Sequence, residues 1–199
     1  MSKPFSESCV QNREPILAVI SSILSESGKL LEIGSGTGQH AVYFAPELPH
    51  IDWYTSDQAM YLPGISMWLE EADLRNIHGP IELDVSLSTW PDIRADAVFS
   101  ANTVHIMHWP DVVAMLSGAG RCLVEGGDLI LYGPFNYDSR YTSESNARFD
   151  ALLRSRDPQS GIRDFEALNE LAERNGMSLE NDFSMPANNR ILHWKKNPT

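Results

Sequence analysis

Short apolar runs recur along the chain, and stretches with apolar residues at three- and four-residue steps lie between them. The runs are rich in Leu, Ile, Val and Phe, and each has the length of a buried strand: residues 29–33, 51–56, 81–85, 95–100 and 128–132. Segments with helical spacing cover residues 41–48, 60–77 and 111–127, the last of which is predicted to end at Gly126 and Gly127. This alternation predicts parallel strands joined by right-handed crossovers, and therefore an open α/β sheet with helices on both faces.

The pattern changes after residue 132. Residues 145–157 and 164–176 have helical spacing, and two strand-like runs follow, 178–185 and 190–196. The link between these runs, "PANN", has the composition of a turn, which predicts a C-terminal hairpin whose last strand is antiparallel to the other strands. We therefore expect one domain over residues 1–199 with an open, seven-stranded, mostly parallel, doubly wound Rossmann-like sheet.

The N-terminal segment 7–24 is predicted to form an amphipathic helix. Its inward face is formed by Ile16, Ile20, Ile23 and Leu24. Pro15 is expected to separate the start of this helix from the preceding segment. A polar cluster of Gln11, Asn12 and Arg13 stands just before Pro15. These residues either form a lid over a bound ligand or serve only in capping and solvation.

Composition and charge narrow the classes of partner. The net charge of −12 repels polyanions, and the 199 residues contain no run of Lys and Arg, so nucleic acid is not an expected partner. No apolar stretch reaches the roughly 20 residues of a membrane span, and the N-terminus "MSKPFSESC" is unlike a signal peptide. We expect a soluble, cytoplasmic protein without a membrane partner. Cys9 and Cys122 are interpreted as free thiols, and no spacing of His, Cys and carboxylates predicts a metal site.

The stretch "LEIGSGTGQH", residues 31–40, predicts a ligand-binding loop directly after the first strand. A nicotinamide or flavin fingerprint has the spacing GxGxxG, and Gln39 stands where its third glycine belongs. Glu32 would repel a pyrophosphate, whereas it can accept hydrogen bonds from an ammonium group or from the waters around it. The loop therefore favours a ligand with a cationic, amino-acid-like end. The expected contacts are Glu32, Gly34, Ser35, Gly36 and Gly38.

Two acidic residues at later strand ends extend this site. Asp57 ends the second strand, where a carboxylate can accept hydrogen bonds from both ribose hydroxyls. Asp84 ends the third strand, and with Val85 it is expected beside an adenine ring. A cationic amino-acid end, a ribose and an adenine together describe S-adenosylmethionine.

Motifs along nearly the whole chain carry a family resemblance. They are "EIGSGTGQHAVYFA", "NTVHIMHW", "LYGPF", "SESNARFDALLRSRDP", "GIRDFEAL" and "MPANN". The glycine loop resembles that of class I S-adenosylmethionine-dependent methyltransferases, and the full set resembles the methyltransferase-like 26 family, a bacterial and animal group classed as a domain of unknown function. The resemblance implies the Rossmann-like methyltransferase fold, with S-adenosylmethionine as cofactor and S-adenosylhomocysteine as product. It also favours Asn12 and Arg13 as lid residues over the cofactor.

The fourth strand is followed by "NTVHIMHWP", which supplies candidate residues for contacts with the cofactor and with the methyl acceptor. Asn102 is expected at the cofactor. Methyltransferases that act on amino groups of bases or glutamine carry two prolines after this position, and "NTVH" lacks both, which argues against that class of acceptor. His105 is a candidate general base because histidine titrates near neutral pH, although a structural role is an equal alternative. A structural role is favoured for His108.

Other segments supply candidates for the substrate pocket. After the fifth strand, Phe135 and Asn136 are predicted to line it, and Asn188 of the hairpin turn is predicted near the substrate. Arg163 either forms a surface ion pair with Asp164 or binds a substrate carboxylate, and the ion pair is slightly favoured.

Two functions from different classes fit these observations. The first is an enzyme that transfers a methyl group from S-adenosylmethionine to a small molecule, which would be anionic if Arg13 or Arg163 reached the pocket. The second is a non-catalytic protein that binds S-adenosylmethionine or S-adenosylhomocysteine as a sensor or partner subunit. A third alternative, a nicotinamide oxidoreductase, is weakened by Gln39.

Overall fold

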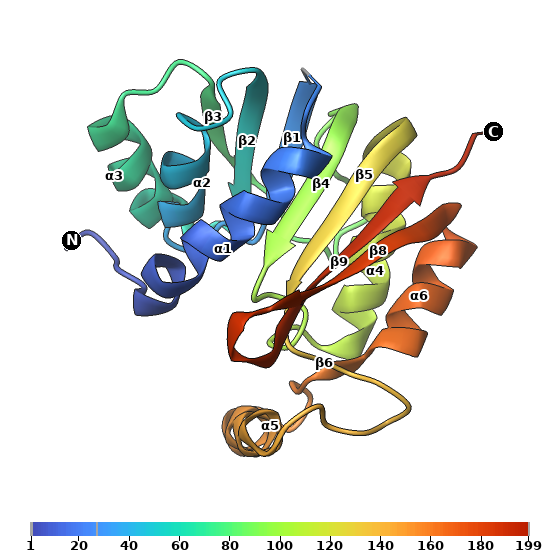
Figure 1. Ribbon diagram of the computed structural model, residues 1–199. Helices are drawn as coiled ribbons and strands as arrows, with labels where there is room; N and C mark the ends of the chain where they lie inside the picture. Colours follow the sequence, from blue (N-terminus) through green and yellow to red (C-terminus); the bar gives the residue numbers. More distant parts are fainter. Residues whose placement is uncertain (1, 27, 199) are drawn as a thin grey trace.

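A seven-stranded sheet forms the centre of the molecule in the computed structural model, which describes residues 2–26 and 28–198 (Figure 1). The strand order is β3-β2-β1-β4-β5-β9-β8. Their bounds are β1 Gly28–Ile33, β2 Ile51–Asp57, β3 Ile77–Glu82, β4 Ala95–Ala101, β5 Leu123–Gly133, β8 Met177–Met185 and β9 Asn189–Lys196. The first five strands pair in parallel, and β9 is antiparallel to both β5 and β8. The predicted sheet with its closing hairpin is confirmed.

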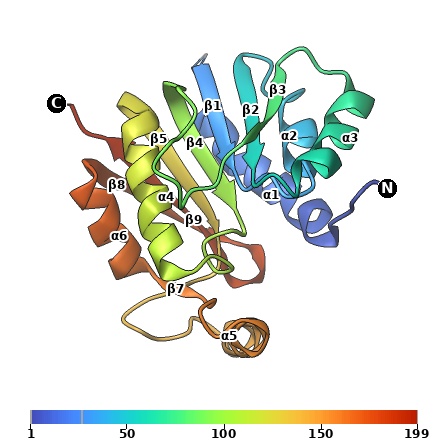
Figure 2. The same ribbon diagram turned by 180° about the vertical axis from the view of Figure 1, so that it is seen from behind.

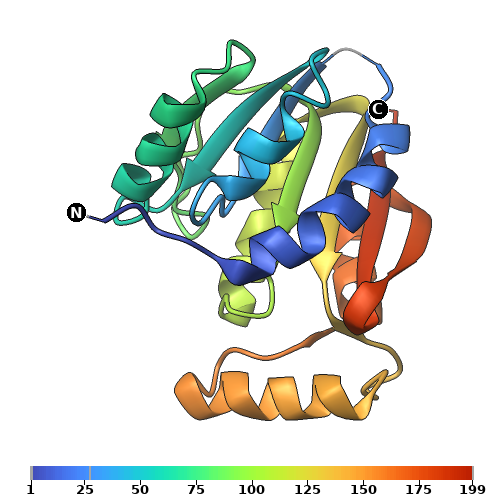
Figure 3. The ribbon, with the colours of Figure 1, turned by 60° about the vertical axis from the view of Figure 1, so that its left-hand side comes forward.

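Helices cover both faces of this sheet. They are α1 Glu7–Ile23, α2 Gln39–Phe44, α3 Leu62–Ala72, α4 Trp109–Cys122, α5 Glu144–Arg156 and α6 Phe165–Arg174. Helices α1 and α2 lie on one face, with α3 beside α2 and β3, and α4 and α6 lie on the other face (Figures 1 and 2). Helix α5 lies apart from both layers, beyond the carboxyl ends of β4 and β5 (Figure 3). It is therefore placed at the edge of the sheet where parallel α/β folds bind ligands.

Two apolar clusters, one on each face, hold the helices to the sheet. Under α1 and α2, the rings of Phe44, Trp53 and Phe99 contact one another with centroids 5.6 to 6.0 Å apart. On the other face, Met115 of α4 and Leu168 of α6 are fully buried. Burying each such side chain stabilises the fold by about 1.5–3 kcal/mol. The rigid sheet that results fixes the positions of the loops at its carboxyl edge.

Several helix boundaries differ from the sequence prediction. Helix α1 runs from Glu7 through Pro15, so Gln11, Asn12 and Arg13 lie within it. Burial of its apolar face outweighs the backbone hydrogen bond that a proline cannot donate. Helix α2 begins at Gln39 and ends at Phe44. Helix α3 ends at Ala72, because Asp73 takes a left-handed conformation with φ of 48°.

Strand boundaries shift as well. Strand β3 starts at Ile77, four positions before the predicted residue 81, and residues 83–85 lie beyond its end. Helix α4 ends at Cys122, because Leu123 is extended and pairs with β4. Gly126, at φ of +75°, therefore lies in β5, where the register with β4 shifts, and not at a helix end.

Smaller elements connect the large ones. Strands β6 (Phe135–Asn136) and β7 (Arg163–Asp164) pair in parallel as a separate two-stranded sheet, which the sequence did not predict. A 3-10 turn, η1 (Pro186–Asn188), links β8 to β9. Within residues 2–26 and 28–198, no helix is long and apolar enough to cross a membrane.

Candidate functional site

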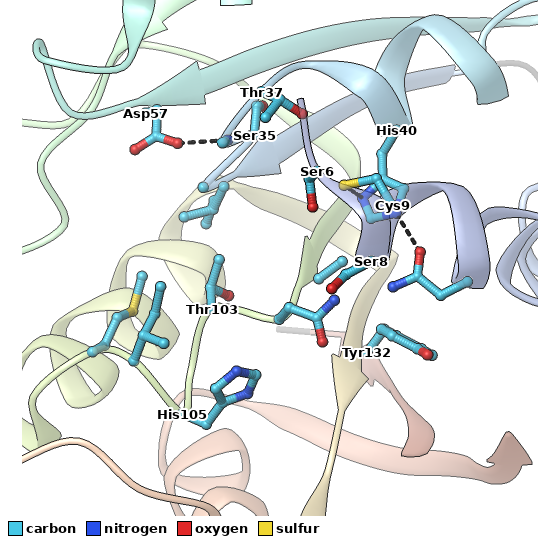
Figure 4. Close-up of a pocket in the computed structure, with 18 of the residues that line it drawn as sticks. Ser6, Ser8, Cys9, Ser35, Thr37, His40, Asp57, Thr103, His105 and Tyr132 are labelled. Carbon is cyan, nitrogen blue, oxygen red and sulfur yellow. Dashed lines mark hydrogen bonds between the residues drawn. The ribbon is translucent and has the colours of Figure 1, made fainter. Parts of the chain in front are cut away.

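A cavity of about 1060 Å³ opens at the carboxyl edge of the sheet. Its wall combines the glycine loop after β1, the end of β2, residues 83–85, the segment after β4, Tyr132 of β5 and parts of α1, α5 and η1. Asp57, Thr103, His105 and Tyr132 surround this space (Figure 4). Its volume is at the upper end of the usual range for small-molecule sites. Two ligands of moderate size can therefore be held together.

The glycine loop approaches the cavity with its backbone. Gly34, Gly36 and Gly38 all have positive φ, of +73°, +59° and +86°. A Cβ on Gly34 would collide with the Thr103 methyl group, so this glycine is needed for packing. A Cβ on Gly36 would meet nothing within 4 Å and would project into open space. Gly36 is therefore the loop position whose side chain would compete with a ligand.

Glu32 lies outside the cavity lining and supports the glycine loop through hydrogen bonds. Its carboxylate is buried and accepts hydrogen bonds from the Ser35 hydroxyl at 2.9 Å and from the Trp53 indole at 3.1 Å. Burial is the main cause that raises the pKa of Glu32 to about 7. Ser35 in turn accepts a hydrogen bond from the backbone N–H of Ser56 and lines the cavity. Glu32 thus holds the shape of the loop through Ser35.

Asp57 lines the cavity at the end of β2, with 8% of the residue exposed. Its Oδ2 accepts a hydrogen bond from the Gly36 N–H at 2.7 Å, and its Oδ1 accepts one from the Gln58 N–H at 2.8 Å. Burial raises the pKa of Asp57, and these two hydrogen bonds oppose the rise. Each carboxylate oxygen has a second lone pair. The side chain can therefore accept ligand hydroxyls while it holds the glycine loop.

Three further predicted cofactor contacts, Asp84, Val85 and Asn102, lie along the same wall. Asp84 and Val85 follow β3 and line the cavity, and Asp84 accepts hydrogen bonds from both the N–H and the hydroxyl of Ser86. Asn102 lines the cavity in a left-handed conformation with φ of 59°. Its N–H donates to the Tyr132 carbonyl at 2.9 Å. Gly38 lies outside the lining, where a Cβ would lie 3.3 Å from Ile65 of α3.

His105 lines the cavity beyond the end of β4 and is 4% exposed. Its Nδ1 is buried and has no hydrogen-bond partner within the described part of the chain. Burial is the main cause that lowers the pKa of His105 to about 4, and the nearby Arg163 charge contributes. The ring is therefore neutral near pH 7. It meets the Phe149 ring edge to face, with centroids 5.3 Å apart.

Two contacts brace the segment that carries His105. The His105 carbonyl accepts a hydrogen bond from the Gly161 N–H at 2.8 Å. The Arg163 guanidinium donates to the carbonyls of Val104, at 3.1 Å, and Met107. Arg163 itself lies outside the cavity lining. The structure therefore differs from both roles predicted for Arg163, an ion pair with Asp164 and a contact with the substrate.

His108 differs from His105 in its surroundings. It lies at the rim of the cavity, and its Nε2 is 2.7 Å from Asp157 Oδ2. Both side chains are about two-fifths exposed. His108 also occupies the position before α4, although its side chain makes no capping hydrogen bond.

The N-terminal helix contributes one of its two predicted lid residues to the lining. Asn12 lines the cavity, and its Oδ1 lies 2.7 Å from Nε2 of His40. Burial lowers the pKa of His40 to about 4, so this ring is neutral and donates to Asn12. Arg13 points elsewhere, with its guanidinium 4.3 Å from the centre of the Tyr43 ring. Arg13 lies outside the lining because this contact holds it against α2.

The three predicted substrate residues on other segments also lie outside the lining. Phe135 is fully buried in the apolar cluster beneath α4 and α6. Asn136 is buried beside it in β6, and its Oδ1 has no hydrogen-bond partner among the described residues. Asn188 contacts α5, where its carbonyl accepts a hydrogen bond from Asn146 at 3.1 Å. The neighbours of Asn188, Ala187 and Asn189, line the cavity instead.

Several lining residues were not predicted as part of the site. They include Cys9, His40, Thr103, Asp111 and Phe149. His40 follows the glycine loop by two positions, and this proximity is a signal that could have identified it. The helical spacing of Phe149 predicts a core residue, so only the position of α5 beyond the sheet reveals its contact with His105. Among the described residues, no cluster of three or more His, Cys, Asp or Glu side chains could hold a metal ion.

The comparison with known families identifies the chain. The family described as "Protein of unknown function (DUF938)" matches residues 3–196. The chain belongs to this family. The DUF938 match covers the sheet, all the helices described above and the whole cavity wall except Ser2.

Solved structures of methyltransferases share the fold of this DUF938 protein. An O-methyltransferase family protein from Burkholderia thailandensis has a TM-score of 0.84 at 14% identity, over 96% of this chain and 58% of that chain. The apo S-adenosylmethionine-dependent methyltransferase SibL has a TM-score of 0.81 at 18% identity, over 96% and 56%. The mitomycin 7-O-methyltransferase MmcR has a TM-score of 0.81 at 18% identity, over 95% and 54%. The chain spans little more than half of these proteins, and the likeness establishes the Rossmann-like methyltransferase fold.

Proposed function

We propose that this protein transfers a methyl group from S-adenosylmethionine to a small-molecule acceptor. The observation that carries the proposal is the cavity itself, in which a glycine loop held by Asp57 faces a buried, unpartnered histidine, His105. The fold shared with S-adenosylmethionine-dependent methyltransferases supports it.

The residues at the inner wall fit this cofactor. Gly36 leaves open space where any side chain would intrude, and Asp57 keeps free lone pairs for the two ribose hydroxyls. Asp84 and Val85 stand beyond the next strand, in the place expected for an adenine contact. When bound, S-adenosylmethionine supplies an activated methyl group to the acceptor. Asn12 and Asn102 are the remaining lining residues that we assign to cofactor binding.

His105 is the residue that we assign to proton transfer. Its neutral ring can accept a proton from an acceptor hydroxyl or amine, and its unpartnered Nδ1 leaves that capacity unused by the protein. The Gly161 and Arg163 contacts hold its backbone, so Arg163 acts as a positioning residue. Orientation of the acceptor within the cavity supplies much of the rate of such a displacement.

We also propose that the protein belongs to the methyltransferase-like 26 group. The motifs "EIGSGTGQHAVYFA" and "MPANN" support membership of the methyltransferase-like 26 group. We assign the protein to the cytoplasm and to small-molecule partners. The net charge of −12 is the reason for not including nucleic acid.

Calorimetry with S-adenosylmethionine, S-adenosylhomocysteine and NAD is the first test. We expect the two sulfur compounds to bind and NAD not to bind, and a preference for NAD would overturn the proposal. The second test incubates the protein with methyl-labelled S-adenosylmethionine and metabolite extracts. Transfer of label to a small molecule is expected, and it should be lost in His105→Gln. Binding without transfer to any extract would indicate a sensor or partner subunit instead of an enzyme.

A further inference from the structure

The charged groups in the cavity wall have one sign. Three carboxylates line it, from Asp57, Asp84 and Asp111, and no Lys or Arg side chain lines it among the residues that the structure describes. His108 belongs to a pair with Asp157, which cancels any positive charge that it carries. The lining therefore carries a net negative charge, whose effect the low-dielectric walls strengthen, while the charge of Arg163 acts at His105 from outside the lining.

Three cations that neighbour lining residues in sequence or in contact have other partners. Arg13 contacts the Tyr43 ring, and Arg163 donates to backbone carbonyls. Lys3 forms an ion pair with Glu71 at 2.6 Å on α3. None of the three lines the cavity, so a carboxylate or phosphate on the acceptor would have no cationic partner there.

Part of the cavity wall is apolar. Ile106 and Phe149 line it, yet they are 57% and 36% exposed. Met107, Pro134 and Pro186 extend this apolar lining. Large apolar side chains that line a cavity and remain exposed to solvent mark a surface that a ligand can cover. The edge-to-face contact of Phe149 with His105 places aromatic surface directly beside the proposed base.

From these observations, we infer that the acceptor is an aromatic molecule, uncharged or cationic, that carries its hydroxyl or amino group toward His105. This inference rests on the proposed function and names its substrate class. S-adenosylmethionine carries a sulfonium, an ammonium and a carboxylate, hence one net positive charge, which leaves the three-carboxylate wall negative. An anionic acceptor is therefore disfavoured with the cofactor bound as well as without it.

The test uses three probes with the same ring system and different charge: 2-naphthol, 2-naphthylmethylamine and 2-naphthoate. Their binding is titrated near neutral pH, by calorimetry or ligand-observed NMR, with and without saturating S-adenosylhomocysteine. We expect the neutral and cationic probes to bind and 2-naphthoate to bind at least about tenfold more weakly. Asp111→Asn should reduce the difference in affinity between 2-naphthoate and the other two probes. Equal or tighter binding of 2-naphthoate, or no binding of any probe, would overturn the inference.

A pair of variants on α5 tests where in the cavity the aromatic probe binds. Phe149→Ala should weaken binding of 2-naphthol about tenfold or more, whereas Leu152→Ala should leave it unchanged, because Leu152 is exposed on the same helix and lies outside the cavity lining. Equal effects of the two variants would contradict the proposed position. Binding of S-adenosylhomocysteine in the same preparations separates the two proposals. If it fails to bind while the probes keep their charge preference, the proposed function fails and the charge selectivity of the cavity stands.

Discussion

The carboxylate of Asp57 accepts a hydrogen bond of 2.7 Å from the backbone N–H of Gly36, a residue that precedes it by 21 positions. This contact joins the end of β2 to the glycine loop after β1, on neighbouring parallel strands. It fixes the loop with its backbone facing the cavity, while one side of the carboxylate remains available to a ligand. Asp57 therefore has two functions, the support of the loop and the proposed contact with the ribose.

Replacement of Asp57 by alanine should weaken binding of S-adenosylhomocysteine strongly. The variant loses the ribose contacts and releases the Gly36 N–H, which we expect to cost on the order of 1.5–3 kcal/mol, or roughly tenfold to a hundredfold in affinity. Calorimetry measures the change. Asp52→Ala is the matched control, since Asp52 lies on the same strand and forms an ion pair with His78 at the surface. Equal affinity of the two variants would show that Asp57 is not a cofactor ligand.

His105→Gln should reduce methyl transfer by about 10²–10⁴-fold and leave the affinity for S-adenosylhomocysteine within about twofold. The reason is that glutamine keeps polar atoms in the cavity and cannot act as a base. Label transfer from S-adenosylmethionine and calorimetry give the two quantities. His78→Gln serves as control, because His78 lies in β3 with a pairing to Asp52 outside the cavity. Full activity of His105→Gln would refute the assignment.

The pH profile of the wild-type protein gives a separate check on His105. Burial lowers the pKa of this ring to about 4, so it remains neutral and able to accept a proton at every pH above that value. The acid limb of the transfer rate should therefore lie near pH 4 and not near the ordinary histidine value of 6.5. An acid limb near 6.5 that disappears in His105→Gln would contradict the buried, neutral ring.

Stability should depend on pH through the buried histidines. His40 and His105 both have a pKa of about 4 in the folded protein and 6.5 as the ordinary value. The unfolded chain therefore binds more protons between these limits, and the stabilisation present above pH 6.5 is lost as the pH falls toward 4. Each residue contributes on the order of 3 kcal/mol. Urea denaturation across this range measures the loss, which should be smaller in His40→Gln and unchanged in His78→Gln.

Glu32 changes the pH dependence of stability in the direction opposite to that of the two histidines. Its pKa is raised from 4.5 to about 7, so the folded state favours the protonated form. This contribution is fully present below pH 4.5 and is lost as the pH rises through 7. Glu32→Gln should therefore reduce the loss of stability between about pH 4.5 and 7, as measured by urea denaturation. An unchanged slope over this pH range in that variant would contradict the raised pKa of Glu32.

The sheet and the glycine loop could be predicted from the sequence because each leaves a local signal. Apolar runs of strand length identify β1, β2 and β4 to within one or two residues. The loop is visible because its glycines at 34, 36 and 38 adopt a backbone conformation that other residues avoid. Asp57 and Asp84 follow from the rule that parallel strands gather their carboxyl ends at one edge.

The rest of the site depends on contacts between distant segments, which local patterns do not record. Arg163 lies beside Asp164 in sequence, yet two of its three carbonyl partners lie 56 and 59 positions earlier. Phe135 follows a strand that reaches the cavity, but its pairing in β6 turns it into the core. Pro15 gives a strong local signal for a helix break, and tertiary packing of α1 overrides it.

Gly36→Val and Gly126→Val form a matched pair that separates backbone strain from ligand contact. Both glycines have positive φ, +59° and +75°, and a Cβ on either would meet nothing within 4 Å, so valine brings similar strain to both sites. Only Gly36 lines the cavity, whereas Gly126 lies at the irregular start of β5. We expect similar losses of melting temperature in both variants and a loss of S-adenosylhomocysteine affinity, of about tenfold or more, in Gly36→Val alone. Measured on the same preparations, near-normal affinity in folded Gly36→Val would mean that the glycine serves the turn between β1 and α2 and that the loop does not contact the cofactor.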